Sequence, residues 1–348
     1  MSPHVATTLL LGLLFGTTIT LTSSHWLLAW MGLEMNTLAI LPLMAKPHHP
    51  RAVEATTKYF LTQATAAAML LFASTANAWL TGQWEIQQMS HPLPVTLITL
   101  ALALKLGLAP LHSWLPEVLQ GLDLSTGLIM STWQKLAPFA LLMQFQHNHP
   151  TLLIAMGILS TLIGGWGGLN QTQLRKILAY SSIAHLGWMI LVLQFSPPLT
   201  LLTLITYFVM TISTFLVFKL INSTNINTLA TSWAKTPALV SLTPLVLLSL
   251  GGLPPLTGFM PKWLIIQELT AQHLAPLATM AAITALLSLY FYLRLSYAIA
   301  LTISPNTLTG PISWRFLPAR PTMPTATSMT LTMLLLPLTP AVFSLVMD

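Results

Sequence analysis

Long apolar runs alternate with short polar breaks, many containing Pro or Gly, along the whole chain. A helix needs about 20 apolar residues to cross the hydrocarbon core of a bilayer, and most of these runs approach that length. The pattern predicts about eleven membrane-spanning helices, hence an all-α polytopic membrane protein. Their expected limits are 3–22, 25–45, 56–80, 94–115, 123–147, 151–169, 174–194, 199–220, 238–270, 276–303 and 325–346.

Composition supports this fold class and excludes several others. Of the 348 residues, 54% are hydrophobic and only 6% are charged, against about 25% charged in ordinary soluble domains. So few charges cannot cover the surface of a soluble enzyme. The formal net charge of +6 comes from scattered residues that form no basic, aromatic-interleaved patch for nucleic acid. The chain has no cysteine, which excludes disulfides, thiolate metal sites and a cysteine nucleophile.

The positions of the basic residues indicate an orientation. With eleven spans, nine Lys and Arg residues fall in loops on the side of the N-terminus, and the opposite side receives none. Basic loops stay on the side where a membrane protein is synthesised. We therefore expect the N-terminus on that side and the C-terminus across the membrane. The nine are Lys46, Arg51, Lys58, Arg175, Lys176, Lys219, Lys235, Arg315 and Arg320.

Two stretches resemble each other, residues 106–119 (LGLAPLHSWLPEVL) and 251–264 (GGLPPLTGFMPKWL). They lie five spans apart and would cross the membrane in opposite senses. Paired Pro/Gly-interrupted segments of this kind are typical of inverted-repeat transporters, although Leu, Pro and Gly also match by coincidence. The identical pairs are Gly107/Gly252, Leu108/Leu253, Pro110/Pro255, Leu111/Leu256, Pro116/Pro261 and Leu119/Leu264.

The repeat predicts the organisation of the chain as one membrane domain, 1–348. A first inverted repeat is expected over 1–147 and a second over 151–303, followed by an additional C-terminal helix over 325–346. The ninth run, 238–270, is too long for one straight span and carries Gly and Pro at its middle, so a broken helix is expected there.

Four ionisable residues fall near the middle of predicted spans or beside a break. Glu34, Lys105 and Lys135 lie near the centres of the second, fourth and fifth, and Lys262 follows the break in the ninth. Each such group costs about 2.5–3.5 kcal/mol on insertion, or on the order of 10–14 kcal/mol for four. That total is comparable with the net stability of a whole domain, about 5–15 kcal/mol. A purely structural set of ion pairs is one explanation, and a hydrated path for protons is another.

The second explanation follows from elementary electrostatics. Glu34 and Lys105 lie at similar depth on spans that run the same way, so they are candidate partners. Desolvation disfavours the charged form of a buried lysine, which lets neighbouring lysines and one carboxylate exchange a proton. Several polar residues could bridge them with waters, although each could equally be an ordinary core residue. These are His112, Gln134, Tyr180, Ser181, Ser182, His185 and Thr257.

Other motifs indicate no further chemistry. The pairs His48-His49 and His147/His149 have no acidic or sulfur ligand beside them, so we expect no metal site. The glycines within residues 164–168 (GGWGG) follow no strand and favour close helix packing over dinucleotide binding. No nucleophile elbow, Walker loop or haem-binding histidine pair is present. We expect this chain to hold no electron carrier.

Three stretches resemble the proton-conducting, antiporter-like subunits of respiratory complex I. They are residues 30–36 (WMGLEMN), 105–117 (KLGLAPLHSWLPE) and 170–185 (NQTQLRKILAYSSIAH). The resemblance covers essentially the whole chain and is closest to a mitochondrially encoded vertebrate member. The eleven-span count agrees with the animal form of that member, which lacks the first three helices of its bacterial relatives.

The resemblance implies a fold of two inverted five-helix repeats plus one helix, with a polar axis inside the membrane. It implies that Glu34 and Lys105 form the family's Glu–Lys pair and that Lys135 is the central lysine of the next helix. Lys262 matches the charged residue beside the second broken helix, and His185 lies in the connecting region. All five are candidates for proton transfer.

The resemblance also implies partners and location. NADH, flavin, iron–sulfur clusters and ubiquinone are expected in other subunits, with no cofactor bound by this chain. The expected partners are other complex I membrane-arm subunits, including the sister antiporter-like chains, and membrane lipids, but no nucleic acid. The expected location is the mitochondrial inner membrane, with the N-terminus in the matrix and the C-terminus in the intermembrane space. A structural membrane-arm subunit and a free-standing cation/proton antiporter remain as alternatives.

Overall fold

The computed structural model describes residues 2–46, 48–89, 91–145, 150–234, 236–301 and 322–347. Within these ranges every regular element is a helix and no strand forms, which confirms the all-α class. The chain divides into two compact units, Met1–Met156 and Gly157–Asp348, each described by itself below. Several residues used in the charge and metal arguments lie outside the described ranges: His147, His149, Lys235, Arg315 and Arg320.

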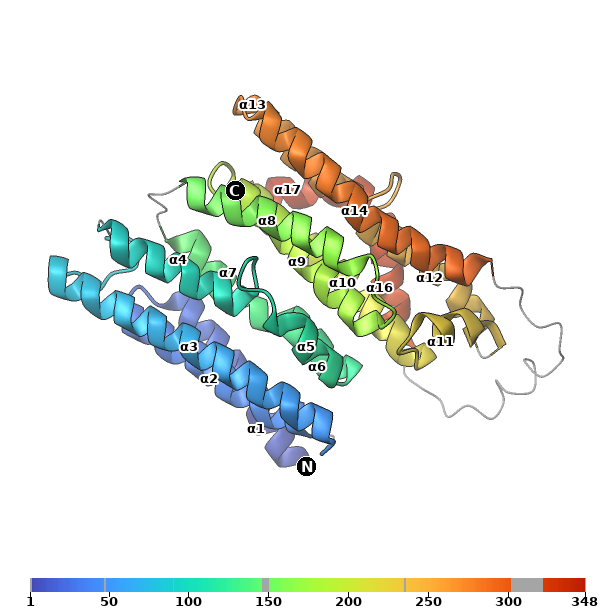
Figure 1. Ribbon diagram of the computed structural model, residues 1–348, viewed down its shortest axis with the longest axis horizontal. Coiled ribbons are helices and arrows are strands. Elements are labelled where there is room, and N and C mark those ends of the chain that lie inside the picture. Colours follow the sequence, from blue (N-terminus) through green and yellow to red (C-terminus); the bar gives the residue numbers. More distant parts are fainter. Residues whose placement is uncertain are drawn as a thin grey trace. The chain divides into compact units, whose positions relative to one another are not determined.

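The first unit is a bundle of mostly antiparallel helices (Figure 1). Helix α2 packs between α1 and α3, and α3 also contacts α4 and α5, while α7 contacts α1, α2 and α4. Because α3 and α7 both approach α4, polar residues on these helices can meet inside the unit. The helices are α1 (Pro3–Thr22), α2 (Trp26–Ala45), α3 (Pro50–Thr81), α4 (Pro92–Leu106), α5 (Trp114–Gly121), α6 (Leu124–Ser131), α7 (Trp133–Gln144) and the start of α8 (Pro150–Gly168).

The second unit is built around α10, which contacts α9, α12, α13, α16 and α17. Helix α14 packs against both α12 and α13. The elements after α8 are α9 (Leu174–Val192), α10 (Pro197–Ile221), α11 (Ile226–Ala230), η1 (Thr231–Ala234), α12 (Pro237–Gly251), α13 (Phe259–Ala271), α14 (Ala275–Ala300), α16 (Met323–Leu334), η2 (Leu336–Leu338) and α17 (Thr339–Met347).

Six described helices are long and apolar enough to cross a membrane singly, namely α1, α2, α3, α8, α10 and α14. Helices α16 and α17 would add a seventh span as a pair bent by 67°. The span expected over 325–346 coincides with this pair, which Pro337 and Pro340 interrupt. The other predicted spans coincide with shorter, broken or more polar helices, and the count of eleven stays a prediction.

The two similar stretches form two similar helix breaks. Helix α4 ends at Gly107 (φ +78°) and α12 at Gly252 (φ +79°), both in the left-handed conformation that glycine tolerates. In each, the next residue's N–H closes a Schellman-type cap: Leu108 bonds to Ala103 at 2.9 Å and Leu253 to Leu248 at 3.3 Å. A cis X-Pro bond follows each glycine. The likeness of the two stretches thus extends from sequence to backbone.

Two boundaries in the first unit differ from the prediction. The fourth span was expected to end near 115, but after the break the chain forms α5, which places Glu117 on a helix instead of in a loop. The fifth span, expected as one helix over 123–147, is divided at Thr132 into α6 and α7. In both cases the apolar pattern continues across a change in helix direction.

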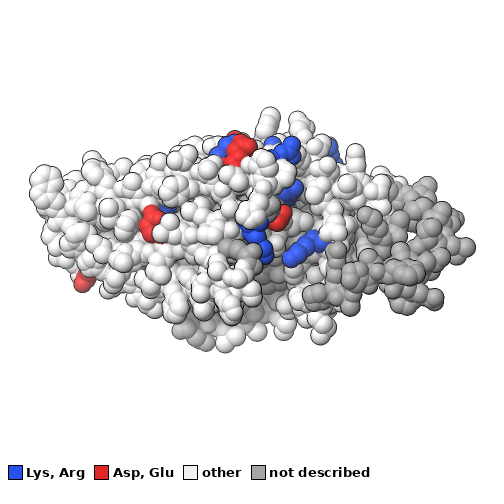
Figure 2. All heavy atoms as spheres, turned by 90° about the horizontal axis from the view of Figure 1, so that it is seen from below, with Lys and Arg blue, Asp and Glu red and all other residues white. Residues whose placement is uncertain are grey.

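The surface is largely apolar. Figure 2 shows a face on which Lys, Arg, Asp and Glu occupy a small share of the described area. Large apolar side chains are exposed, among them Trp79 by 89% and Trp166 by 69%. Contiguous apolar surface of this kind suits lipid or neighbouring subunits.

Glycines allow α8 to lie close against α9 and α14, as the sequence led us to expect. A Cβ added at Gly164 would lie 2.6 Å from the backbone nitrogen of Ala184 on α9, and one at Gly165 would lie 3.2 Å from the carbonyl of Thr284 on α14. Backbone atoms cannot move away easily. The finding confirms close helix packing as the role of this stretch.

This packing predicts the effect of a single methyl group. Gly164→Ala is expected to destabilise the second unit by about 1–3 kcal/mol, as overpacking does. Gly12→Ala is a matched control, because its Cβ would meet only the Cβ of Ala39 at 3.3 Å, and alanine favours the helix. Thermal dissociation of the assembled protein on native gels measures both. Equal stability of the two variants would contradict the packing argument.

Candidate functional site

Lys105 lies in the last turn of α4, directly before the first helix break. Its side chain is buried, with 6% exposure, and its Nζ has no hydrogen-bond partner among the described residues. One of the carbonyls freed by the break, that of Leu104, accepts a bond of 3.0 Å from the Trp114 indole. An ammonium or amine group without a partner is costly in an apolar interior, so this position demands an explanation.

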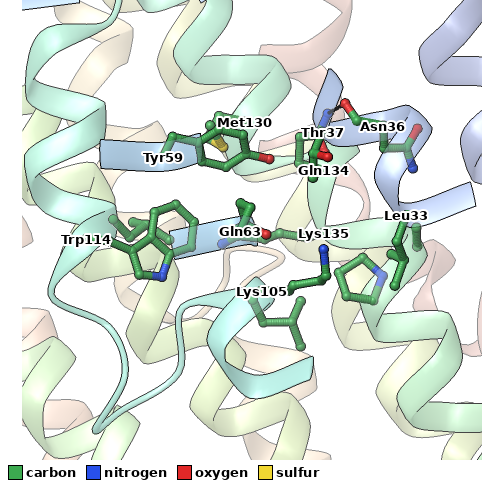
Figure 3. Close-up of a pocket in the computed structure, with 14 residues that line it drawn as sticks. Leu33, Asn36, Thr37, Tyr59, Gln63, Lys105, Trp114, Met130, Gln134 and Lys135 are labelled. Carbon is green, nitrogen blue, oxygen red and sulfur yellow. Dashed lines mark hydrogen bonds between the residues drawn. The ribbon is translucent and has the colours of Figure 1, made fainter. Parts of the chain in front are cut away.

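A cavity adjoins Lys105 (Figure 3). Lys135, on α7 and 3% exposed, lines the same cavity. The centre of a water molecule has about 20 Å³ to occupy there, above the roughly 10–15 Å³ that one water requires. The structure therefore brings two of the predicted lysines together. The full lining is Leu33, Asn36, Thr37, Tyr59, Gln63, Lys105, Leu106, Trp114, Leu115, Met130, Gln134, Lys135, Ala137 and Pro138.

Glu34 is half-buried on α2 and does not itself line the cavity. Its carboxylate accepts a 2.9 Å hydrogen bond from Thr37, which does line it. Among the described residues the ion pairs within 4 Å join Lys58 to Glu54 and Glu117, so Glu34 and Lys105 form no direct ion pair. Glu34 reaches the cavity through Thr37.

The second unit places Lys262 at the second helix break. Its Nζ donates a 2.8 Å hydrogen bond to the carbonyl of Gly251, the last residue of α12. The end of a helix carries unpaired carbonyls and a partial negative charge, which favour a cation there. Lys262 thus lies on one half of the broken helix, α13, and binds the end of the other half, α12.

His185, on α9, shares a cavity with Lys262. Its ring lies 5.5 Å from that of Tyr207 on α10. Thr203 and Thr206 of α10 also line this cavity, which gives the centre of a water molecule about 20 Å³. The candidate residues therefore form two groups: Glu34, Lys105 and Lys135 in the first unit, and His185 and Lys262 in the second.

The polar residues expected to bridge the buried charges make different contacts in the structure. Gln134 lines the first cavity. The hydroxyls of Ser181 and Ser182 bond to carbonyls of their own helix, and Thr257 donates to the carbonyl of Thr332 at 2.8 Å. The His112 ring lies 3.2 Å from the carbonyl of Pro110, within its own helix break.

Sequence reasoning missed four uncharged residues that line the first cavity, Asn36, Thr37, Tyr59 and Gln63. Both polar atoms of the Asn36 amide, and Nε2 of Gln63, are buried without a hydrogen-bond partner in the described part of the chain. Tyr59 and Gln63 are one helical turn apart on α3, a spacing that places them on one face. Two polar residues four positions apart in an apolar run were the sequence pattern that could have indicated Tyr59 and Gln63 as lining residues.

Family models cover almost the whole chain. One described as "NADH:quinone oxidoreductase/Mrp antiporter, TM" matches residues 23–288, and one described as "NADH dehydrogenase subunit 2 C-terminus" matches residues 289–343. NADH-ubiquinone oxidoreductase chain 2 of Tetraodon nigroviridis is 76% identical over 345 residues, which are 99% of each chain. The chain belongs to the NADH-ubiquinone oxidoreductase chain 2 family. The chain 2 of Salmo salar is 69% identical over 346 residues, again 99% of each chain.

Chains of solved membrane complexes share this fold. A chain of respiratory complex I from Thermus thermophilus has a TM-score of 0.82 and 29% identity, covering 96% of this chain and 79% of that one. A chain of the Mrp complex from Dietzia has a TM-score of 0.81 at 17% identity, covering 97% of this chain and 76% of that one, which shows a shared fold. About a fifth of the Thermus chain has no counterpart here.

Proposed function

We propose that this chain is an antiporter-like core membrane subunit of respiratory complex I that conducts protons across the membrane. The observation that carries this proposal is Lys105, buried with no hydrogen-bond partner among the described residues, beside a cavity that it shares with Lys135 and that has room for water. A structural role would leave the lysine paired. A proton carrier must instead keep its nitrogen accessible to a changing partner.

The cavity provides the parts that proton transfer requires. Two amine groups next to one cavity repel when both are charged, so adding a proton to one favours its loss from the other. Glu34, bonded to the cavity-lining Thr37, supplies a carboxylate next to this cavity. In the second unit, Lys262 and His185 share a second cavity. We propose that these five residues form one proton-transfer axis coupled to electron transfer elsewhere.

The chain acts as part of an H⁺-translocating NADH:ubiquinone reductase in this proposal. NADH, flavin, iron–sulfur clusters and ubiquinone bind to other subunits. The sister antiporter-like chains and other membrane-arm subunits are its partners, and its exposed apolar side chains, such as Trp79 and Phe72, face them or lipid. Removing the Lys105 ammonium group in the intact complex tests this function. If the complex assembles normally but loses proton pumping, Lys105 conducts protons and is not merely structural.

The proposed location is the mitochondrial inner membrane, with the N-terminus in the matrix. Because the chain has no cysteine, single cysteines at exposed positions report the orientation without background from this chain. Gln87→Cys is expected to react with a membrane-impermeant maleimide added to mitoplasts. Ser2→Cys is expected to react only after the inner membrane is permeabilised. The mass shift of the isolated chain measures both, and the reverse pattern would contradict the orientation.

A free-standing cation/proton antiporter is distinguishable from this function. It would exchange cations as a purified chain in liposomes, whereas a complex I subunit needs its partners. Proton uptake driven by a sodium or potassium gradient across liposomes holding the isolated chain would support the antiporter.

A further inference from the structure

The proposed axis lacks a direct contact between Glu34 and Lys105 through which a proton could pass. Proton transfer needs heavy atoms within about 2.6–3.2 Å, directly or through one water. The two side chains form no ion pair within 4 Å in the described structure, and the Lys105 Nζ has no hydrogen-bond partner there. A proton can therefore pass between them only through other groups.

Thr37 connects Glu34 to the cavity. Its Oγ1 lies 2.9 Å from Oε2 of Glu34 and 2.9 Å from the Glu34 backbone carbonyl. A hydroxyl has one donor and two acceptor positions. It can donate to the carboxylate when Glu34 is ionised. When Glu34 is protonated, it can accept that proton's hydrogen bond and donate to the carbonyl instead. Thr37 therefore stays bonded in both protonation states.

Tyr59 offers a second hydroxyl from the opposite wall. It is 2% exposed, and its ring packs 5.7 Å from that of Trp114. It lines the same cavity as Thr37 and Lys105. Figure 3 shows its hydroxyl directed from α3 toward the side of Thr37 and Gln134. The Tyr59 hydroxyl therefore faces other polar side chains of this cavity.

Gln63, one turn further along α3, has a different capacity. Its Nε2 is buried without a hydrogen-bond partner among the described residues and lies next to the cavity. An amide NH₂ only donates, so it cannot pass a proton on. It can hold a water by that donor, which suits a positioning role beside the two hydroxyls.

We propose that the hydroxyls of Thr37 and Tyr59, with water in the cavity, form the relay that carries a proton between Glu34 and Lys105. The carboxylic acid of Glu34 gives its proton to the Thr37 oxygen, and Thr37 releases its own proton toward Tyr59. The Tyr59 oxygen takes up that proton and releases its phenol proton to the neutral Lys105 amine. Glu34 ends as a carboxylate and Lys105 as an ammonium, with both hydroxyls restored. The inference rests on the proposed function.

The first test removes one hydroxyl and keeps the ring. Tyr59→Phe in the intact complex, reconstituted into proteoliposomes, is expected to lower NADH-driven proton pumping at least about threefold. The loss should be smaller than the 10²–10⁴-fold typical of a positioned acid–base group, since water partly replaces the hydroxyl. The solvent deuterium isotope effect on turnover should also change. Tyr297→Phe, on α14 and 57% exposed, is the matched control and should pump normally.

A second pair of variants keeps the proposal testable if Tyr59→Phe fails to assemble. Thr37→Ser keeps the hydroxyl and should retain most pumping, whereas Thr37→Val removes it at nearly the same size and should lose pumping. Normal pumping by Thr37→Val would overturn the relay, as would normal pumping by an assembled Tyr59→Phe. If Lys105→Met abolishes pumping in those same preparations, the relay alone is wrong. If Lys105→Met also pumps normally, the proposed function is wrong too.

Discussion

Replacing Lys105 with methionine is expected to abolish most proton pumping by the intact complex while leaving its assembly unchanged. Methionine keeps the unbranched apolar stem of lysine and fills similar space. The change removes the ammonium group, whose Nζ has no hydrogen-bond partner among the described residues. No bond is therefore lost from the fold. The cost of burying an unpaired polar group disappears as well.

The expected loss is large because the lysine would be a direct carrier. A positioned group that accepts and releases a proton contributes on the order of 10²–10⁴-fold. We expect coupled turnover to fall at least about tenfold, with NADH oxidation limited in parallel in tightly coupled vesicles. Pumping is measured with a pH-sensitive dye inside proteoliposomes, and assembly by native electrophoresis.

The matched control is Lys219→Met, which removes an exposed lysine from the last turn of α10. It should pump and assemble normally. Normal pumping by Lys105→Met would favour the structural reading of the buried charges. Failure of Lys105→Met to assemble would show that the side chain has a structural partner outside this chain.

The sequence was sufficient to find the buried charges. A charged residue at the centre of an apolar run is rare, because insertion penalises it by several kcal/mol. Lys105, Lys135 and Lys262 stand out for this reason alone, and the structure places the first two around one cavity. Glu34 was located as well, as a candidate partner of Lys105, and no ion pair within 4 Å joins the two in the described part of the chain.

The helix breaks were predictable in place but not in extent. Gly107 and Gly252 mark where the two helices end, since a left-handed residue is required there. How the chain continues depends on packing that the apolar pattern does not encode. Leu and Val side chains are buried equally well before and after a turn, so they do not show where one helix ends and the next begins. Helix α5 and the bend between α16 and α17 therefore escaped the prediction.

Uncharged polar residues were the hardest to interpret. Most Thr and Ser hydroxyls in this protein bond to a carbonyl three residues earlier in their own helix, as Thr20 does to Thr17 and Thr99 to Thr96. Such residues look alike in sequence. Thr37 makes the same backbone contact but also reaches a carboxylate and a cavity. Only the packing of α2 against α3 and α7 distinguishes it.

Replacing Lys262 with methionine is expected to reduce both stability and pumping, in contrast to Lys105→Met. The Lys262 Nζ donates to the carbonyl of Gly251 at 2.8 Å and so connects α13 to the end of α12 across the break. Hydrogen bonds that involve a charged group contribute about 1.5–3 kcal/mol, and removing the donor leaves a carbonyl without that partner. Loss of the cation also removes its favourable interaction with the helix C-terminus.

Two measurements separate these effects. Thermal dissociation of the complex should occur at a lower temperature in Lys262→Met than in Lys105→Met, and pumping should fall at least about tenfold in both. Lys262→Arg keeps a permanent charge and a donor for Gly251 but cannot release its proton, so it should retain more stability than Lys262→Met while still failing to pump. Full pumping by Lys262→Arg would mean that the cation at this break serves only to join α12 to α13, and that the axis of proton transfer does not pass through it.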